Sequence, residues 1–312
     1  MTDIAERCVE AIHALTGRHD GHRAAHARGT LCAGTFTAAP SASGLTSAAH
    51  MQGDPVRVTV RFSNGSGDPS TPDNDRTDGR GMATKFYLPD GGTTDIVALT
   101  LPCFFVRTPE DFVAFLSARK PDPETGEPDM GKIGAFVQEH PETAAALQLI
   151  LPSLGPPRSY ATCAYNSIHA FRLEGNGDGR HARYRWVPEA GVEALPDDEV
   201  EGAAAEYLQD DIRERLDAGP VRFTLIARLA ADDDAVDDPT VPWPEGEREE
   251  VELGTLELTG LDTERETGDD VLVFDPMRVT DGIEPSDDKI LHVRRPAYSV
   301  SVERRAGVPR PY

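Results

Sequence analysis

The stretch VRVTVRFSNGSGDPSTPDNDRTDGRGMATKFYLPDGGTTDIVAL, residues 56–99, decides the fold class. Apolar and polar residues alternate over 56–63, which is typical of a half-buried strand. Residues 81–102 predict two further strands that are joined by a turn at PDGG, residues 89–92. The polar segment 64–81 between them is long for a loop without a function. The stretch therefore predicts antiparallel strands with a functional loop inserted between them.

Helical patterns flank and interrupt these strands. The N-terminal segment TDIAERCVEAIHALTG has apolar residues at helical spacing, with Thr2 or Asp3 as a cap and Gly17 as a stop. Thr108 caps another helix, and a later helical segment is broken near Pro141. The remaining predicted elements are strands at 167–175, 182–190, 221–232 and 251–262, and helices at about 199–217 and from Ser286, as cap, to Gly307. Since strands follow strands, the pattern favours an α+β protein with an antiparallel sheet or barrel over a doubly wound fold.

Composition restricts the class of protein. The chain has 312 residues, 38% of them hydrophobic and 27% charged, which is typical of a soluble globular protein. A formal net charge of -23 argues against a nucleic-acid partner. No apolar stretch is long enough to predict a membrane-spanning helix, and the acidic start MTDIAERCVE is unlike a secretory signal. With four scattered cysteines and no CxxC pair, these features predict a cytoplasmic protein without a membrane partner.

The last predicted helix carries a pair of side chains that suggests a cofactor. Arg294 and Tyr298 are four positions apart, so they lie on one helical face. Ionising a tyrosine with a pKa of about 10 at neutral pH costs about 4 kcal/mol. A neighbouring guanidinium lowers this cost and a bound ferric ion lowers it further. The pair is suited to a tyrosinate axial ligand of haem iron, although a packed tyrosine beside a solvated arginine would give the same pattern.

Four separated blocks resemble the haem catalase family: RAAHARG (23–29), residues 56–87, LPCFFVRTPEDFVAF (101–115) and DGIEPSDDKILHVRRPAYSVSVERR (281–305). They occur in the order that the family has. The resemblance implies a catalase-type antiparallel β-barrel core with helical insertions, and haem b, a ferric iron protoporphyrin, as cofactor. The implied organisation is a single haem-binding domain over 1–312, with an N-terminal helix at about 2–17, the barrel and its insertions at about 30–275, and a C-terminal haem-ligand helix at about 286–306.

The resemblance also implies roles for individual residues. His26 matches the distal catalytic histidine, and Ser63 matches the serine that orients it. Tyr298 matches the proximal ligand of the haem iron, and Arg294 the arginine that hydrogen-bonds this tyrosinate. Arg23, Arg61 and Arg305 match arginines that pair with the haem propionates, and Phe104, Phe105 and Phe112 match aromatic residues of the distal side.

The chemistry of these residue types agrees with the implied roles. Partly buried propionates need charge-assisted hydrogen bonds, which arginine provides better than lysine, and the interior of a barrel is expected to supply the apolar cavity. His26 is neutral near pH 7, so it can take a proton from a peroxide and return it to the departing oxygen. Arg28 has no assigned role and is expected at the surface.

Three positions depart from the family pattern. The asparagine of the distal pocket aligns with Leu99, so a hydrogen-bond donor that helps to position a second peroxide is replaced by an apolar side chain. A valine that narrows the access channel aligns with Gly65, which predicts a wider entrance for alkyl hydroperoxides or organic donors. Pro296 removes one backbone hydrogen bond within the last helix and predicts a kink before Tyr298.

These features together resemble the small catalase-related peroxidases. The expected activity is therefore a haem-dependent peroxidase that reduces hydrogen peroxide or organic hydroperoxides with a small organic electron donor, with weak or no catalase activity. Whether the chain forms a homo-oligomer is left open by the sequence.

Three alternatives remain open from the sequence. The chain could carry haem or another apolar ligand without turnover, or it could rearrange fatty-acid hydroperoxides without an external donor, as an isomerase or lyase. A third alternative is a metal-binding helix formed by His19, His22 and His26, which share a face if this segment is helical. Gly17, Gly21 and Gly29 punctuate that segment and weigh against a helix.

Overall fold

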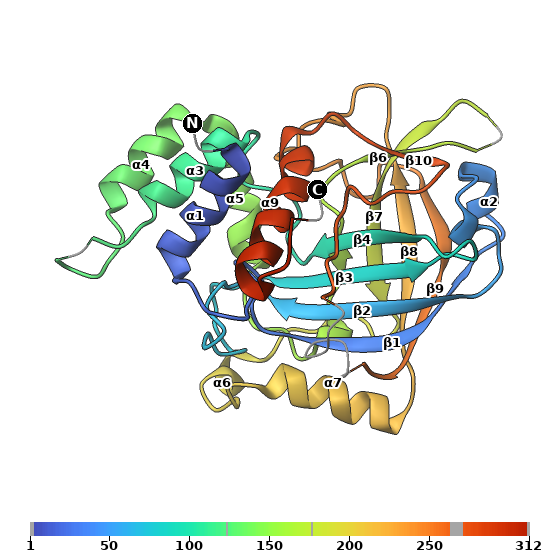
Figure 1. Ribbon diagram of the computed structural model, residues 1–312, viewed down its shortest axis with the longest axis horizontal. Coiled ribbons are helices and arrows are strands. Elements are labelled where there is room, and N and C mark those ends of the chain that lie inside the picture. The colour runs from blue at the N-terminus through green and yellow to red at the C-terminus, as the bar shows by residue number, and fades with distance from the viewer. Residues whose placement is uncertain (1–2, 123, 176, 263–270, 311–312) are drawn as a thin grey trace.

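The computed structural model describes residues 3–122, 124–175, 177–262 and 271–310, and it is organised around one antiparallel β-barrel (Figure 1). The strands are β1 (Gly29–Ala38), β2 (Val56–Asn64), β3 (Arg80–Tyr87), β4 (Thr93–Leu99), β5 (Tyr165–Asn166), β6 (Phe171–Leu173), β7 (Arg180–Pro188), β8 (Val221–Leu229), β9 (Glu250–Leu261) and β10 (Ile283–Pro285). The barrel closes in the order β1-β2-β3-β4-β5-β7-β8-β9, because β9 pairs back with β1 and β7 pairs with β8. β6 and β10 extend the sheet from β7 outside this ring. The predicted α+β fold with a barrel core is confirmed.

Strand register aligns the residues that matter for function. The predicted hairpin is present, with Tyr87 opposite Thr93 and the turn between them. β2 pairs with β1 on one side and with β3 on the other, so Ser63 lies opposite both Gly29 and Gly81. Leu99, at the end of β4, is the next residue along this row. The ends of four neighbouring strands, β1 to β4, therefore form one local platform.

The interior of the barrel is filled with side chains. Phe36, Phe62, Phe86 and Trp186 have no exposed surface and belong to one hydrophobic cluster. Phe36 contacts Phe86 and Trp186 edge-on, at centroid distances of 5.3 and 6.1 Å. An eight-stranded barrel is just wide enough for side chains to fill it. The expectation that the barrel interior supplies a ligand cavity is therefore wrong, and any large cavity has to lie outside the ring.

Helices cover two sides of the barrel. The longer ones are α1 (Ile4–Thr16), α3 (Pro109–Ala118), α4 (Met130–Glu139), α5 (Pro141–Ile150), α7 (Tyr207–Ala218) and α9 (Lys289–Ala306), and the short turns are α2 (Ala42–Leu45), η1 (Ala49–Met51), η2 (Leu151–Ser153), η3 (Tyr160–Thr162) and α6 (Asp197–Val200). In Figure 1, α1, α3, α4 and α5 form a group beside the barrel, and α9 lies between this group and the strands. α1 packs on both α3 and α9, and α7 packs on β9. None of the helices in the described ranges has the length and apolar character that a membrane span requires.

The first residue of a helix can be determined by a capping side chain from a distant part of the chain, and α7 is an example. The helix predicted at about 199–217 is only partly correct. α7 (Tyr207–Ala218) ends close to the predicted position, with Gly219 as its C-cap, but residues 201–206 separate it from α6. Asp73, far away in the chain, accepts a hydrogen bond from the amide of Leu208 at 2.8 Å and so caps the first turn of α7.

The last helix also begins later than predicted. Asp288, not Ser286, is its N-cap, because the Asp288 carboxylate accepts hydrogen bonds from the amides of Ile290 and Leu291 at 2.8 and 3.3 Å. α9 continues through Pro296 to Ala306. Of the strand predicted at 167–175, only β6 is formed.

Candidate active site

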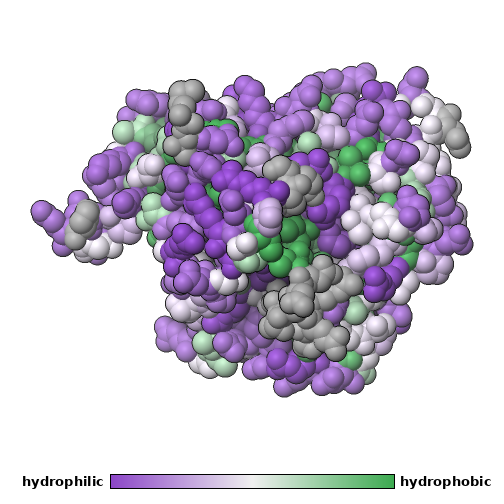
Figure 2. Space-filling view, viewed as in Figure 1, coloured by the Kyte–Doolittle hydropathy of each residue, from purple (hydrophilic) through white to green (hydrophobic). Residues whose placement is uncertain are grey.

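A cavity of about 260 Å³ lies outside the barrel, between the platform of strand ends and α9. Arg61 and Ser63 on β2 line it, whereas Phe62 between them belongs to the core cluster of the barrel, as strand alternation requires. Val9 and Ile12 of α1, Phe112 of α3, Val97 of β4, and Phe274, Val293, Ala297 and Val302 close most of the remaining wall. Figure 2 shows apolar side chains at the surface beside α9, on the face where β3 and β4 pass under it. The lining of the cavity is thus mainly apolar.

One wall of the cavity holds His26 in an unusual backbone conformation. Its φ is 56°, in the left-handed region that residues other than glycine rarely adopt. Its Nδ1 is 3.1 Å from Ser63 Oγ. A Cβ on Gly81 would lie 2.8 Å from Ser63 Oγ and 3.0 Å from the imidazole, so the pair needs glycine at this position of β3. Three separated segments therefore combine to hold one imidazole against the cavity.

The electrostatic setting of His26 favours its neutral form. Burial, and then the charge of Arg61, lower the pKa of His26 from 6.5 to about 4. Arg61 itself donates to the carbonyl oxygens of His26 and Ala27 at 3.0 and 3.3 Å. A neutral imidazole at neutral pH has a nitrogen that can accept a proton, which is what a general base requires.

The opposite wall carries the pair on α9 that the sequence singled out. Nε and Nη2 of Arg294 both donate to the phenol oxygen of Tyr298, at 2.9 and 2.6 Å. Both residues line the cavity. A guanidinium placed in this way balances negative charge on the phenol oxygen, which is the arrangement that a phenolate ligand of a metal requires.

Arginines give the cavity a positive charge. Arg23, Arg61, Arg294 and Arg305 line it, and none of the described residues in its lining is an aspartate or a glutamate. Arg23 and Arg305 both donate to the carbonyl oxygen of Leu272, at 3.3 and 2.9 Å, so their guanidinium groups lie close together. In a chain with a formal net charge of -23, this concentration of arginine is suited to an anionic ligand with an apolar body.

The three predicted phenylalanines take different places. Phe104 and Phe112 line the cavity, whereas Phe105 is not in its lining. Phe105 stacks on Phe104 with a centroid distance of 4.4 Å and packs against Phe115 behind it. Phe105 therefore packs behind Phe104 and holds it in the cavity wall.

Two further cavity residues were not singled out as site residues by sequence reasoning. Ile168 lines the cavity and has a φ of 63°, which no local pattern signals. His169 is buried, and its Nδ1 is 2.6 Å from Asp288 Oδ2, while burial lowers the pKa of the imidazole. The contact with Asp288 satisfies His169 as a core histidine, but its position in the cavity wall could only be seen in the structure.

Arg28 is not a surface residue, contrary to expectation. Its side chain is 17% exposed and lies within 3.5 Å of the buried carboxylate of Asp73. It donates to the carbonyl oxygens of Pro69 and Ala205, at 3.0 and 2.8 Å. Arg28 therefore connects the polar loop after β2 to the segment before α7.

The predicted role of Gly65 is not supported by its surroundings. Gly65 is not in the cavity lining, and a Cβ at this position would lie 2.6 Å from Asp78 Oδ1. The carboxylate of Asp78 occupies the space beside Gly65, so the absence of a side chain at this position does not widen a channel.

The metal-binding helix of three histidines is not formed. Residues 17–28 contain no helix. Across the described ranges, the one group of three side chains that could hold a metal ion is Asp111, His140 and Glu142, which includes none of His19, His22 and His26. His26 faces the cavity, while His22 is exposed.

Comparison with known proteins agrees with this combination of barrel, cavity and α9. Residues 7–310 match the family model for catalase, so the chain belongs to the catalase family. It is 43% identical over 306 residues to the catalase-related peroxidase of Mycolicibacterium paratuberculosis, covering 98% of this chain and 96% of that one. The catalase-related peroxidase of Synechococcus elongatus is 34% identical, with 96% of this chain and 88% of that one covered.

Full-size catalases are more distant and longer. The catalase of Vibrio cholerae is 31% identical, and the match covers 91% of this chain and 58% of that one. A crystal structure of a fungal catalase superposes with a TM-score of 0.81 at 24% identity. This superposition covers 93% of this chain and 61% of the fungal one, and it shows that the two share a fold.

Membership of the catalase family implies a haem cofactor, and the donor set of the cavity fits one. A haem combines a flat apolar body with two carboxylates and an iron that needs an axial ligand. The cavity offers apolar walls, arginines without accompanying carboxylates, and the phenol oxygen of Tyr298 beside a guanidinium. The residues present therefore meet each chemical requirement of the group.

Proposed function

We propose that this protein is a haem b peroxidase that reduces hydrogen peroxide or organic hydroperoxides with a small organic electron donor and has weak or no catalase activity. It is an oxidoreductase of the catalase family that acts on peroxide. The observation that carries the proposal is the placement of the His26–Ser63 pair and the Arg294–Tyr298 pair on the walls of one arginine-rich apolar cavity. Two relatives of which the match covers 96% and 88% of their own length are both named catalase-related peroxidases.

In this proposal three kinds of contact hold the cofactor: a ligand to the iron, ion pairs to the propionates and apolar contacts to the ring. The phenol oxygen of Tyr298 would hold the iron, and Arg294, which donates to that oxygen, would balance its negative charge. Arg23, Arg61 and Arg305 pair with the propionates, while Phe104 and Phe112 supply apolar contact. The bound haem supplies the iron at which the peroxide oxygen–oxygen bond is broken.

His26 moves the proton in this scheme. The neutral imidazole accepts a proton from the peroxide and gives it to the departing oxygen as water forms. Ser63 keeps the ring in place through Nδ1, so that the other ring nitrogen remains for the substrate. Such general acid–base transfer typically contributes about 10²–10⁴-fold to a rate.

Leu99 favours peroxidase over catalase activity. It lines the cavity, and it stands where the family resemblance places an asparagine that helps to position a second peroxide. Because leucine has no hydrogen-bond donor, the second peroxide is not positioned for oxidation to dioxygen. An organic donor then becomes the reductant.

Replacing Leu99 by asparagine is expected to raise oxygen release from hydrogen peroxide about fivefold relative to donor oxidation, because one hydrogen bond contributes about 1 kcal/mol. An oxygen electrode and a phenol-oxidation assay on the same preparation measure the ratio. Leu99→Val, which changes shape without adding a donor, is the matched control. An unchanged ratio in the asparagine variant would show that Leu99 does not select the reaction.

The pH profile of the reaction with peroxide tests the state of His26. Because burial and Arg61 hold the pKa of His26 at about 4, the imidazole stays neutral from pH 8 down to about pH 5. We expect kcat/KM for hydrogen peroxide to be flat over that range and to fall as pH drops through about 4. A midpoint near 6.5, the ordinary value for histidine, would contradict the burial argument.

An absorption spectrum, a pyridine haemochrome assay and peroxide-driven oxidation of a phenolic donor test the function as a whole. We expect a Soret band, haem b in the haemochrome assay, and donor oxidation with both hydrogen peroxide and an alkyl hydroperoxide. A Soret band without donor oxidation would indicate a carrier. Conversion of a lipid hydroperoxide without donor would indicate an isomerase or lyase, and protein that stays colourless after reconstitution with haem would end the proposal.

We also infer that the chain acts as one haem-binding domain in the cytoplasm. The cavity takes residues from α1, the barrel and α9, so no part of the chain contains the whole site. All four cysteines are free thiols and buried, which is consistent with a reducing compartment.

A further inference from the structure

We propose that Asp78 is a positioning residue for His26 and acts through the backbone of Gly65 and Ser66. The inference rests on the proposed function, which assigns proton transfer to His26. Asp78 belongs to the polar loop and does not line the cavity, but in this inference it affects the rate of the reaction with peroxide.

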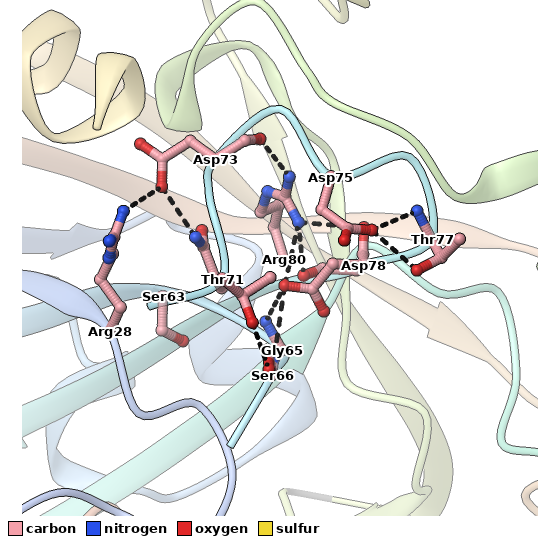
Figure 3. Close-up of polar contacts among 12 residues, drawn as sticks. Arg28, Ser63, Gly65, Ser66, Thr71, Asp73, Asp75, Thr77, Asp78 and Arg80 are labelled. Carbon is pink, nitrogen blue, oxygen red and sulfur yellow. Dashed lines mark hydrogen bonds and ion pairs between the residues drawn. The ribbon is translucent and has the colours of Figure 1, made fainter. Parts of the chain in front are cut away.

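Two hydrogen-bonded steps connect the Asp78 carboxylate to the backbone of His26. Asp78 Oδ2 accepts hydrogen bonds from the amides of Gly65 and Ser66, at 3.0 and 3.3 Å (Figure 3). The carbonyl oxygens of the same two residues accept hydrogen bonds from the amides of His26 and Ala27, at 3.1 and 2.9 Å. One peptide group joins the two steps, because it carries both the Ser66 amide that donates to Asp78 and the Gly65 carbonyl oxygen that accepts from His26. The carboxylate therefore orients the peptide group that holds the amide of His26.

The backbone of His26 needs such support. A φ of 56° at a residue with a side chain is a strained conformation that persists only when its surroundings impose it. Arg61 holds the carbonyl side of this segment through His26 and Ala27. The Gly65–Ser66 peptides hold the amide side, so the two sets of contacts clamp the segment from both directions.

Gly65 is the residue that allows the carboxylate to approach. A Cβ at Gly65 would lie 2.6 Å from Asp78 Oδ1 and 3.2 Å from the carbonyl oxygen of Gly79. A contact below 3.0 Å to a Cβ requires one of the two groups to move, so a side chain at position 65 would displace the Asp78 carboxylate from its present place. Gly65 and Asp78 thus form one structural unit.

The carboxylate is itself fixed from behind. Arg80 is 1% exposed, and its Nη1 lies 3.4 Å from Asp78 Oδ2 and donates to the backbone carbonyl oxygens of Asp78 and Gly79. Its Nη2 donates to the carbonyl oxygen of Asp73 at 2.6 Å. The Asp78 side chain is only 13% exposed, and burial raises its pKa while the Arg80 charge opposes this rise. Asp78 is therefore set in a rigid corner of the loop.

The experiment compares Asp78→Ala, Asp78→Asn and Asp75→Ala in the haem-containing full chain. Displacement of a catalytic group by about 1 Å costs up to about 100-fold, so we expect Asp78→Ala to lower kcat/KM for hydrogen peroxide about tenfold or more at unchanged haem content. Amide hydrogen exchange at His26 and Ala27 should become faster. Asp78→Asn keeps an oxygen acceptor and should recover most of the rate. Asp75, whose carboxylate accepts hydrogen bonds from the amide and the hydroxyl of Thr77 in the same loop, serves as the control and should change the rate less than about twofold.

A double-mutant cycle with Gly65→Ala tests the shared mechanism. Gly65→Ala should displace the carboxylate and so lower the rate as Asp78→Ala does. In the Asp78→Ala background the added methyl group meets no carboxylate, so its further effect should be small. If Asp78→Ala does not fold, Gly65→Ala by itself tests the same displacement with the aspartate retained.

Two results would overturn the inference: wild-type rate and exchange in Asp78→Ala, or a lowered rate with unchanged exchange at His26 and Ala27. The failure of the proposed function is a separate result, namely a wild-type protein that does not react with peroxide. Exchange at His26 in Asp78→Ala would still decide the connection in that case.

Discussion

Replacing His26 by alanine is expected to lower kcat/KM for hydrogen peroxide by about 10²–10⁴-fold while haem remains bound. Burial and the charge of Arg61 lower the pKa of His26 to about 4, so its imidazole is neutral at neutral pH and can take a proton. The contacts proposed to hold haem, at Tyr298, Arg294 and the other arginines, do not involve the side chain that is removed. Stopped-flow measurement of the reaction with peroxide, together with haem content per chain, checks both parts of the prediction.

His22→Ala is the matched control for this variant. His22 lies four positions from His26 in the same segment, but it is exposed. Its removal should leave the rate unchanged. Undiminished turnover in His26→Ala would remove this histidine from the mechanism, whereas loss of haem in the same variant would show that His26 has a structural role.

Replacing Tyr298 by phenylalanine is expected to abolish stable haem binding and with it all peroxide-driven oxidation. The variant keeps the ring and deletes one oxygen, the atom that accepts both hydrogen bonds from Arg294. Loss of a residue that only supports a metal ligand costs about 10–100-fold in affinity, so loss of the ligand itself should exceed that range. Haem transfer to an apo-globin acceptor measures the change in affinity, and the position of the Soret band reports the ligand.

Tyr87→Phe is the control for the tyrosine variant. Tyr87 is at the other end of β3, and its hydroxyl is 3.0 Å from Thr59 Oγ1. Haem affinity should not change there. If Tyr298→Phe bound haem as tightly as the wild type, with the same Soret band, another residue would have to be the axial ligand.

Several elements of the fold followed from local patterns. The strand at 56–63, the turn at 89–92 and the cap at Thr108 all appear in the structure where the sequence placed them. The prediction that this strand is half-buried is wrong, because every residue of β2 except Arg57 is buried. The helical spacing of Arg294 and Tyr298 likewise predicted their contact. Each of these signals depends on residues within a few positions of one another, because turns, caps and helix faces form within one or two turns of chain.

Elements that depend on distant residues could not be predicted in this way. The start of α7 depends on Asp73, which accepts a hydrogen bond from the amide of Leu208. The start of α9 depends on which side chain accepts a hydrogen bond from the amide of Ile290, and this is Asp288 and not Ser286. Arg28 appeared to be a surface residue because its partners at Pro69 and Ala205 come from other parts of the chain. Gly65 predicted a wider entrance to the cavity, but in the structure the carboxylate of Asp78 lies beside it.

The sequence by itself determined which residue types are available for the chemistry: a histidine with a serine, a tyrosine with an arginine, and additional arginines in a chain that is otherwise strongly acidic. It also determined that Arg61 and Ser63 face the side of β2 opposite to Phe62, because successive side chains of a strand alternate. Only the tertiary structure decided which of the two sides carries the cavity. Closing eight strands leaves room inside for side chains alone, so the ligand space has to form outside, where α9 packs back against the first strands.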